Sequence, residues 1–381
     1  MELKVRYPHL HLIDWPFYIG WDKCLYPIMA DRTQLNADIT TLLRSLSRRP
    51  TSSIHLMWAW FGAGKTHTLR HIEYLCKHEF NNLTPIYMEF TKGTRNFLDI
   101  YKSFVSKIDL EALNNAYLEV FTNPSKNDVQ REMRFDFPDL SNALKLLYMG
   151  TDQQQEIAVR WLRTEYRELR TLRTIGVTRP ILTAEDALKA ISWVIHLISL
   201  GGSSSKDSPV RVLWMIDEFQ YIKDCRPPAQ EGITSCLRSV FNRCPKSLSI
   251  IISFSGRPEA KKMPPWLPRE LSDIIGIEPV LLLPPLTSTD AFKFIQDLLA
   301  YFRNPQSNIS NDFFPFTKET VEEIIGIVVK KAKLKPRSVM QFFDAVLREA
   351  EPQLERGEIS IITPDFAKNV LKDRIFLDQE E

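Results

Sequence analysis

The fold is decided by the stretch Ala59-Trp60-Phe61-Gly62-Ala63-Gly64-Lys65-Thr66. It fits the pattern G-x-x-x-x-G-K-[ST], except that Ala59 stands where the pattern has its first glycine. An apolar run at residues 53–59 leads into it, and a helical pattern at residues 67–77 follows it. A buried strand, a glycine-rich turn and a helix in this order form a cradle for phosphate groups, because backbone N–H groups and the helix dipole both favour an anion there.

The residues of this loop have separate predicted roles. Backbone N–H groups from Gly62 to Thr66 would surround the β-phosphate of ATP, and Lys65 would reach the β- and γ-phosphates. The hydroxyl of Thr66 would bind Mg²⁺. The predicted nucleotide contacts of the loop are Gly62, Ala63, Gly64, Lys65, Thr66 and His67. The alternative is a chance G-A-G-K-T in a strand–helix turn, and the legible strand and helix on either side argue against it.

A second, acidic element lies downstream. The apolar run Val212-Leu213-Trp214-Met215-Ile216 ends in Asp217 and Glu218. Asp217 is predicted to support the Mg²⁺ ion, and Glu218 is predicted to be the general base that activates water. Alone, two carboxylates after an apolar run are also typical of a strand that ends in a solvated turn. Together with the phosphate loop, and in this order, they predict an ATPase that hydrolyses ATP to ADP and phosphate.

The remaining pattern alternates strands with helices, which predicts an α/β fold with a parallel sheet covered by helices on both faces. The expected strands are residues 53–59, 85–90, 210–217, 248–254 and 279–283. Residues 96–200 are helical almost throughout, with breaks near 124–128 and 176–180, and form a long excursion before the acidic strand. The predicted domains are an N-terminal arm at 1–30, an ATPase core at 31–284 with a helical insertion at about 125–200, and a helical lid domain at 285–381 with a short acidic tail.

Composition limits the environment and the partners. The 49 basic and 47 acidic residues leave a net charge of only +2, so any affinity for nucleic acid must come from local patches. The five cysteines show no C-x-x-C pairing, which favours a reduced, intracellular protein over a disulfide framework or a zinc site. The N-terminus lacks an apolar leader, and no run approaches the roughly 18 apolar residues of a membrane span. We therefore expect a cytoplasmic protein without a membrane partner.

These two motifs resemble those of AAA+ ATPases, and within them the branch that contains the ORC-type replication initiators. The order of elements extends the resemblance over about residues 17–371, although only the two motifs are highly specific. The resemblance implies a polar sensor of the γ-phosphate at the end of the strand at 248–254, where Ser253 is preferred and Ser255 is the alternative. An ordinary strand-end serine is the competing interpretation.

The resemblance also implies three arginines at the nucleotide. One comes from a neighbouring subunit of a homo-oligomer, and Arg269 or, as the alternative, Arg257 stands where it is expected. Another acts in cis from the lid, and Arg337, in Lys335-Pro336-Arg337-Ser338, opens a helix as that second sensor does. The third is Arg32, because Ala30-Asp31-Arg32 resembles the short segment that lies over the adenine, which would place Arg32 by the base. The nearby lysines at 330–335 are expected at a helix–helix joint, with their charge facing solvent.

The predicted insertion carries an arginine pattern of its own. Arg160, Arg163, Arg167 and Arg170 recur at spacings of three and four, which predicts one stripe of guanidinium groups on a helix. Such a stripe could track nucleic-acid phosphates or pair with acids on an adjacent subunit. The alternative is a solvated face paired with Glu165 and Glu168. The sequence from Trp161 to Leu188 resembles ATPases of prokaryotic BREX-type defence islands.

Three hypotheses for the biological role follow. The first is an ATP-driven oligomeric switch that acts on DNA or on a nuclease-like or transposase-like partner in an anti-phage defence or mobile-element system. The second is a regulator similar to the TnsC-type transposition proteins, because the chain shows no winged helix after the lid. The third is a nucleotide-dependent scaffold that activates a protein effector without touching DNA, for which residues 7–21, rich in Pro, His, Trp and Tyr, are a candidate docking arm.

Overall fold

A computed structural model describes residues 5–18, 25–30, 32–49, 51–202, 210–256, 281–372 and 374. The chain divides into two compact units. The sheet unit takes Thr40–Trp58 and Ile72–Leu281, and the lid unit takes Met1–Ile39, Ala59–His71 and Leu282–Glu381. This division differs from the predicted succession of arm, core and lid, because the phosphate loop groups with the lid. Helices α1 (Thr33–Arg48) and α2 (Lys65–His78) each run from the lid unit into the sheet unit.

Five strands form one sheet in the order β2-β3-β4-β1-β5. Strands β2, β3 and β4 are parallel, with Glu89 opposite Asp217 and Ile216 opposite Ile252. All residues of β1 and β3 are buried, as expected for strands that helices cover on both faces. The strands are β1 Ser53–Ala59, β2 Leu83–Glu89, β3 Arg211–Asp217, β4 Leu248–Ser255 and β5 Leu281–Leu283. The predicted parallel sheet is confirmed, with boundaries within two residues wherever the structure describes them.

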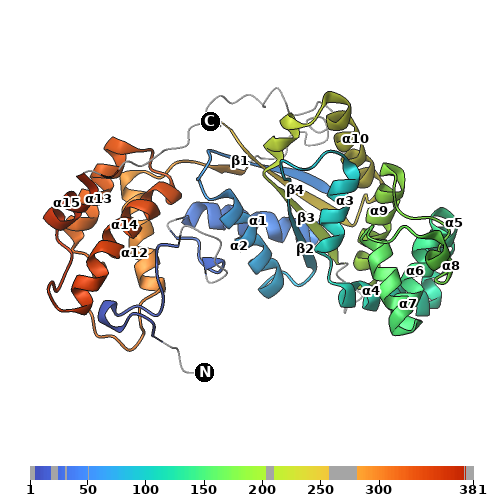
Figure 1. The fold of residues 1–381 in the computed structure, drawn as a ribbon, viewed down its shortest axis with the longest axis horizontal. Coiled ribbons are helices and arrows are strands. Elements are labelled where there is room, and N and C mark those ends of the chain that lie inside the picture. Colours follow the sequence, from blue (N-terminus) through green and yellow to red (C-terminus); the bar gives the residue numbers. More distant parts are fainter. Residues whose placement is uncertain are drawn as a thin grey trace. The chain divides into compact units, whose positions relative to one another are not determined.

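Three helices pack beside the sheet in the sheet unit (Figure 1). They are α3 (Phe97–Ser106), α9 (Ala184–Gly201) and α10 (Pro227–Arg243). Helix α3 contacts β2, α9 contacts β3, and α3 also contacts both other helices. Their buried side chains join those of the strands in a single apolar core. The carboxyl ends of β3 and β4 are thereby held on a rigid base.

The helical excursion between β2 and β3 is confirmed, and it is more finely divided than predicted. It continues beyond α3 with α4 (Leu110–Thr122), α5 (Asn127–Asp136), α6 (Pro138–Met149), α7 (Asp152–Leu162) and α8 (Leu169–Arg173). Both predicted breaks are present. Additional breaks occur at Phe137, at Gly150 and between Leu162 and Leu169, where the helical pattern of the sequence continues but the backbone does not.

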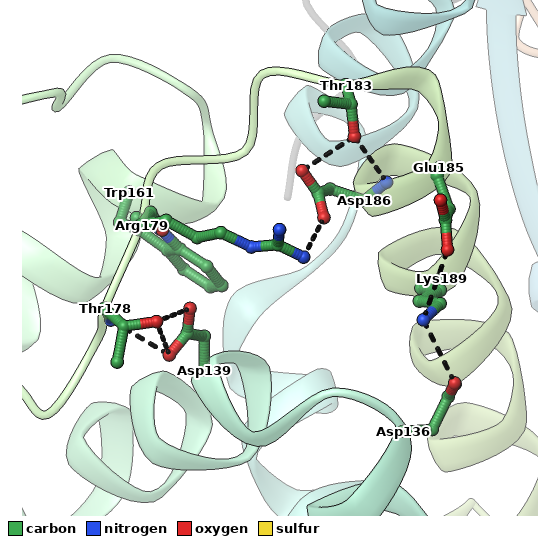
Figure 2. A network of polar contacts seen from close by, with 9 residues as sticks. All are labelled: Asp136, Asp139, Trp161, Thr178, Arg179, Thr183, Glu185, Asp186 and Lys189. Atoms are coloured by element: carbon green, nitrogen blue, oxygen red, sulfur yellow. Dashed lines mark hydrogen bonds and ion pairs between the residues drawn. The ribbon is translucent and has the colours of Figure 1, made fainter.

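Partly buried polar contacts hold the segment after α8 in place (Figure 2). The Trp161 indole N–H donates to the carbonyl oxygen of Arg179 over 2.9 Å. The Asp139 carboxylate accepts hydrogen bonds of 2.9 Å from both the backbone N–H and the hydroxyl of Thr178. The Arg179 guanidinium donates to Asp186 over 2.7 Å. Helices α6, α7 and α9 are therefore joined through one irregular segment.

Asp136, at the end of α5, connects the insertion to the helices of the sheet unit. Its carboxylate receives the Trp193 indole N–H at 2.8 Å and the Arg243 guanidinium at 2.5 Å. The Lys189 ammonium lies 3.4 Å from it and equally far from the exposed carboxylate of Glu185. Since these partners lie on α9 and α10, the insertion is attached at its base by charged hydrogen bonds as well as by apolar packing.

The predicted arginine stripe on a single helix is wrong. Helix α7 ends at Leu162, and Thr164 adopts a left-handed backbone with φ of 61°. The Thr164 N–H bonds to the carbonyl of Trp161, and the Glu165 N–H bonds to that of Arg160. This is the Schellman arrangement that terminates a helix. Beyond it, residues three or four apart in the sequence no longer lie on one helix face. Arg160 lies on α7, Arg163 and Arg167 in the turn, and Arg170 on α8.

The lid unit has a separate apolar core built on four helices, α12 (Ser288–Tyr301), α13 (Lys318–Lys331), α14 (Pro336–Glu355) and α15 (Pro364–Lys372). Residues near the N-terminus belong to this core. Phe17 is fully buried against Phe316 and Phe343, and the Trp15 indole N–H donates to Asp344 over 2.8 Å. The candidate docking arm is therefore wrong for Trp15 and Phe17, because both side chains are already covered by the lid helices.

Among the helices of the described residues, none combines the length and the apolar character that crossing a bilayer requires.

Candidate functional site

The phosphate loop in the lid unit has the backbone that a cradle requires. Gly62 has φ of 79° and Gly64 has φ of 95°, both in the left-handed region that favours glycine. The Ala63 N–H donates to the carbonyl of Trp60 over 3.2 Å, which closes the turn. Helix α2 begins at Lys65, immediately after the second glycine. Among the described residues, apart from the two chain neighbours of Gly64, no atom lies within 4 Å of a Cβ built on this glycine.

Lys65 is almost fully buried, and its ammonium donates to the Trp60 carbonyl over 3.3 Å. Its charge therefore lies along the loop that it is predicted to serve. The ring Nε2 of His67, two residues after Lys65, lies 2.7 Å from the carbonyl oxygen of Ile28. Burial lowers the pKa of His67, so this ring is neutral and donates to that carbonyl. The predicted nucleotide contact of His67 is then limited to its backbone.

Helix α14 brings Arg337 to the loop within the same unit. The Arg337 N–H lies 3.4 Å from the Gly62 carbonyl, and its guanidinium lies 4.9 Å from the centre of the Phe61 ring. Lys335 is 4% exposed, and a Cβ built on Gly62 would lie 3.6 Å from its Cδ. The expectation that the lysines at 330–335 face solvent is therefore wrong for Lys335.

Other cations of the lid unit are also engaged. The Lys333 ammonium lies 4.2 Å from the centre of the Trp60 ring. The Lys331 ammonium donates to the carbonyl of Leu371 over 2.7 Å. Arg32 donates through Nη1 to the carbonyl of Pro284 over 3.0 Å. The aromatic residues at the variable positions of the loop thus receive lid cations, a role that the motif alone does not predict.

The acidic element lies in the sheet unit at the end of β3. Asp217 is fully buried, and its carboxylate accepts hydrogen bonds from the Tyr87 hydroxyl at 3.1 Å and from the Glu218 N–H at 2.9 Å. Glu218 has a left-handed backbone with φ of 56°, which turns the chain out of the strand. Its carboxylate accepts a hydrogen bond from the side-chain amide of Gln220. Sequence reasoning missed Tyr87 and Gln220, although an amide inside the apolar run Phe219–Ile222 is a detectable signal.

The neighbouring strand end carries both predicted sensor serines. Because β3 and β4 are parallel with Ile216 opposite Ile252, Ser253 is level with Asp217 in the register. Ser253 is fully buried, and its hydroxyl has no hydrogen-bond partner in the part of the chain that the structure describes. An orphaned buried hydroxyl at the carboxyl end of a parallel sheet fits a polar ligand. The Ser255 N–H donates to Gln220 over 2.9 Å, while Arg257 and Arg269 lie outside the described residues.

The arginines of the insertion differ in their surroundings. Arg160 lies 3.7 Å from Glu156 and 3.9 Å from Glu165, and its guanidinium lies 4.8 Å from the centre of the Tyr166 ring. The other three are exposed, and among the described residues no ion pair is formed by Arg163, Arg167 or Arg170. The solvated-face interpretation with Glu165 thus holds for Arg160 alone. The exposed charge is concentrated in the turn and in α8.

Comparisons with known proteins support the fold. No protein-family model matches the chain, and no curated protein matches its sequence. Its structure is similar to the Aeropyrum pernix ORC2 protein in ADPNP–ADP complexes, with a TM-score of 0.53, 13% identity, and coverage of 93% of this chain and 72% of that one. It is also similar to Drosophila ORC bound to DNA, with a TM-score of 0.50, 10% identity, and coverage of 93% and 63%.

The chain thus spans less than two thirds of the Drosophila chain that it matches. The similarity to both structures extends over 93% of this chain, which has a sheet in the order β2-β3-β4-β1-β5, a helical excursion before β3 and a helical lid. The predicted fold class, an AAA+ α/β fold, is confirmed. At such low identity the similarity is one of fold.

Proposed function

We propose that this protein is an AAA+ ATPase that binds ATP with Mg²⁺ and hydrolyses it. The observation that carries the proposal is the phosphate loop, in which two left-handed glycines lead from a buried strand into the N-terminus of α2. The backbone of such a turn presents several N–H groups to one anion, and the helix dipole adds a partial positive charge. A side chain at either glycine would strain this backbone.

The loop residues hold and orient the triphosphate. The N–H groups from Gly62 to His67 contact the phosphates, and the Lys65 ammonium exchanges the Trp60 carbonyl for β- and γ-phosphate oxygens. Thr66 and Asp217 would hold the Mg²⁺ ion, which would supply positive charge to the phosphates. Asp217 is suited to this task because the Tyr87 hydroxyl and the Glu218 N–H fix its carboxylate.

The strand ends provide the groups that act on water and on the γ-phosphate. Glu218 accepts the proton of the attacking water, and the orphaned Ser253 hydroxyl donates to the γ-phosphate. Arg337 supplies positive charge in cis from α14, where it already contacts the loop. Arg32 lies beside the adenine. In a homo-oligomer, Arg269 or Arg257 of a neighbouring subunit completes the site.

The first test is nucleotide binding and turnover of three variants. Lys65→Ala should abolish binding of a fluorescent ATP analogue. Glu218→Gln should bind it normally and hydrolyse ATP roughly 10²-fold more slowly, the scale of a lost general base. Lys77→Ala, on the exposed side of the same helix α2, is the control and should behave as wild type. Wild-type affinity in Lys65→Ala would refute the assigned loop.

We further propose that ATP binding drives assembly into an oligomer that acts on DNA, within a defence or mobile-element system. The exposed arginines of the turn and of α8 favour a DNA partner over a pure protein scaffold, because guanidinium groups can form bidentate hydrogen bonds with phosphates. This role accommodates a nuclease-like or transposase-like effector, and a TnsC-like regulator is the second candidate. The buried aromatic residues near the N-terminus weigh against the docking-arm version of the scaffold.

DNA binding is tested by neutralising the exposed cluster. The variant Arg163→Gln, Arg167→Gln, Arg170→Gln should bind duplex DNA more weakly, and its affinity should depend less on salt by about 2–3 in the log–log slope, since each lost phosphate contact removes about 0.9. The control Arg131→Gln, Lys145→Gln, Arg238→Gln removes the same charge from exposed positions elsewhere. Equal losses in both variants would indicate a diffuse charge effect and refute the site.

Assembly is read in the same series by mass photometry of wild type and Glu218→Gln with ATP. Particles that form with ATP and keep the same mass when DNA is added would favour the scaffold hypothesis instead.

A further inference from the structure

Gln220 connects the predicted general base to the end of the neighbouring strand. It lies in the short helix η4 (Phe219–Asp224), directly after the turn at Glu218, and is 8% exposed. Its amide oxygen accepts the backbone N–H of Ser255 over 2.9 Å, and its amide nitrogen donates to the Glu218 carboxylate. One side chain thus bridges the carboxyl ends of β3 and β4. Gln220 lies two residues after Glu218, and its partner Ser255 lies two residues after Ser253.

The two contacts fix which way the amide faces. A glutamine amide has one accepting oxygen and one donating nitrogen. The Ser255 N–H can only donate, so the oxygen must face β4 and the nitrogen must face Glu218. Burial keeps water from competing for either group. The arrangement therefore presents a donor to the carboxylate that a flexible, exposed side chain would not hold in place.

We propose that Gln220 is a positioning residue for Glu218, which it holds ready to accept a proton from water and ties to the strand end that carries Ser253. The proposal rests on the proposed ATPase function. Because Glu218 leaves the strand with a left-handed backbone, its carboxylate is not oriented by the β3 ladder and needs a side-chain partner. If Ser253 contacted the γ-phosphate and displaced the end of β4, the Gln220 amide would transmit that displacement to Glu218.

The discriminating variant is Gln220→Glu. The new carboxylate keeps the length of the side chain and can still accept the Ser255 N–H, but it cannot donate to Glu218 when ionised. ATP affinity should stay within about 3-fold of wild type, while kcat should fall about 10-fold or more, as expected for partial loss of a general-base contribution of roughly 10²-fold or more. Gln220→Met, which loses both hydrogen bonds at similar volume, should lower kcat at least as far. Gln153→Glu, an exposed position on α7, is the matched charge control.

A double-mutant cycle separates positioning from a merely structural role. If Gln220 acts through Glu218, adding Gln220→Glu to Glu218→Gln should slow single-turnover hydrolysis by less than about 2-fold further, because residues that act as a unit are not additive. Additive losses, or a wild-type kcat in Gln220→Glu, would overturn the proposal while leaving the ATPase assignment intact. Absence of hydrolysis by the wild-type protein would overturn both.

Discussion

Three backbone positions with positive φ lie at the two motifs, and they differ in kind. Gly62 and Gly64 adopt the left-handed region at little cost, because they have no Cβ. Glu218 adopts it with a side chain, at a cost of about 1 kcal/mol. Such a cost persists where the surrounding contacts fix the turn, and here Asp217 accepts the Glu218 N–H while Gln220 donates to the carboxylate. The strained residue is also the one to which we assign proton transfer.

At the residue scale, two glycine variants distinguish a glycine that the backbone conformation requires from one that it does not require. Gly64→Ala should lower ATP affinity at least 10-fold, because alanine at φ of 95° strains the loop by about 1–3 kcal/mol although no atom of the described residues blocks its Cβ. Gly326→Ala, in helix α13 with equally open space, should instead raise the free energy of unfolding by about 0.5–1 kcal/mol. Titration with a fluorescent ATP analogue measures the affinity, and urea unfolding measures the free energy of unfolding. Unchanged affinity in Gly64→Ala would mean that the left-handed loop is dispensable.

At the scale of elements, the insertion depends on how its helices begin and end. Helix α7 starts with a capping box at Thr151 and Gln154 and ends in the Schellman turn at Thr164. Helix α9 begins at Ala184, after the N-cap Thr183, whose hydroxyl accepts the Asp186 N–H while donating to the Asp186 carboxylate. The same carboxylate receives Arg179 from the irregular segment (Figure 2). Asp186 therefore supports both a helix start and the connection that precedes it.

Removal of that carboxylate tests this dependence. Asp186→Ala should lower the free energy of unfolding by about 2–3 kcal/mol, since it breaks charged hydrogen bonds at a site that is 3% exposed. Hydrogen exchange should accelerate first in residues 174–183. Glu185→Ala, one position earlier and exposed, loses only a surface ion pair with Lys189 and should change stability by less than about 0.5 kcal/mol. Equal effects of the two variants would show that the segment does not rest on Asp186.

At the scale of the whole molecule, stability should depend on pH through a histidine. His196 on α9 contacts the carbonyl of Arg243 through Nε2 at 2.9 Å. Burial lowers its pKa, and Arg243 lowers it further, against opposing effects of the Arg243 carbonyl hydrogen bond and of Glu132. The unfolded chain then binds a proton more readily than the folded one. This contribution to stability is complete above the unfolded pKa of about 6.5 and is lost as pH falls below it.

Thermal unfolding at pH 7.5 and pH 5.5 tests this linkage. The melting temperature of the wild type should fall on acidification, and His196→Gln should fall less, because glutamine keeps a donor for the Arg243 carbonyl but does not titrate. His78→Gln is the control, because His78 is exposed at the end of α2 and likewise contacts a backbone carbonyl, that of Tyr74. A variant as acid-sensitive as the wild type would remove His196 from the linkage.

The local features of this protein were readable in the sequence. Strand β1 has the predicted bounds, because a seven-residue run that is apolar except for Ser53 and His55 depends only on near neighbours. The phosphate loop could also be placed, since its glycines are required by backbone geometry. Asp217 and Glu218 followed from a strand that ends in charge. None of these predictions needed to know which surfaces meet.

Tertiary structure decided the rest. The arginine spacing predicted one helix, but a left-handed Thr164 ended it, and Trp161 was drawn inward by the distant Arg179 carbonyl. The sequence predicted Trp15 and Phe17 as part of a docking arm, but the lid helices bury both side chains. The role of Gln220 depends on its contact with Ser255, which exists because β4 lies beside β3 in the sheet. Periodicity records the environment within a turn or two of chain, whereas burial and the partners of polar groups depend on segments tens to hundreds of residues away.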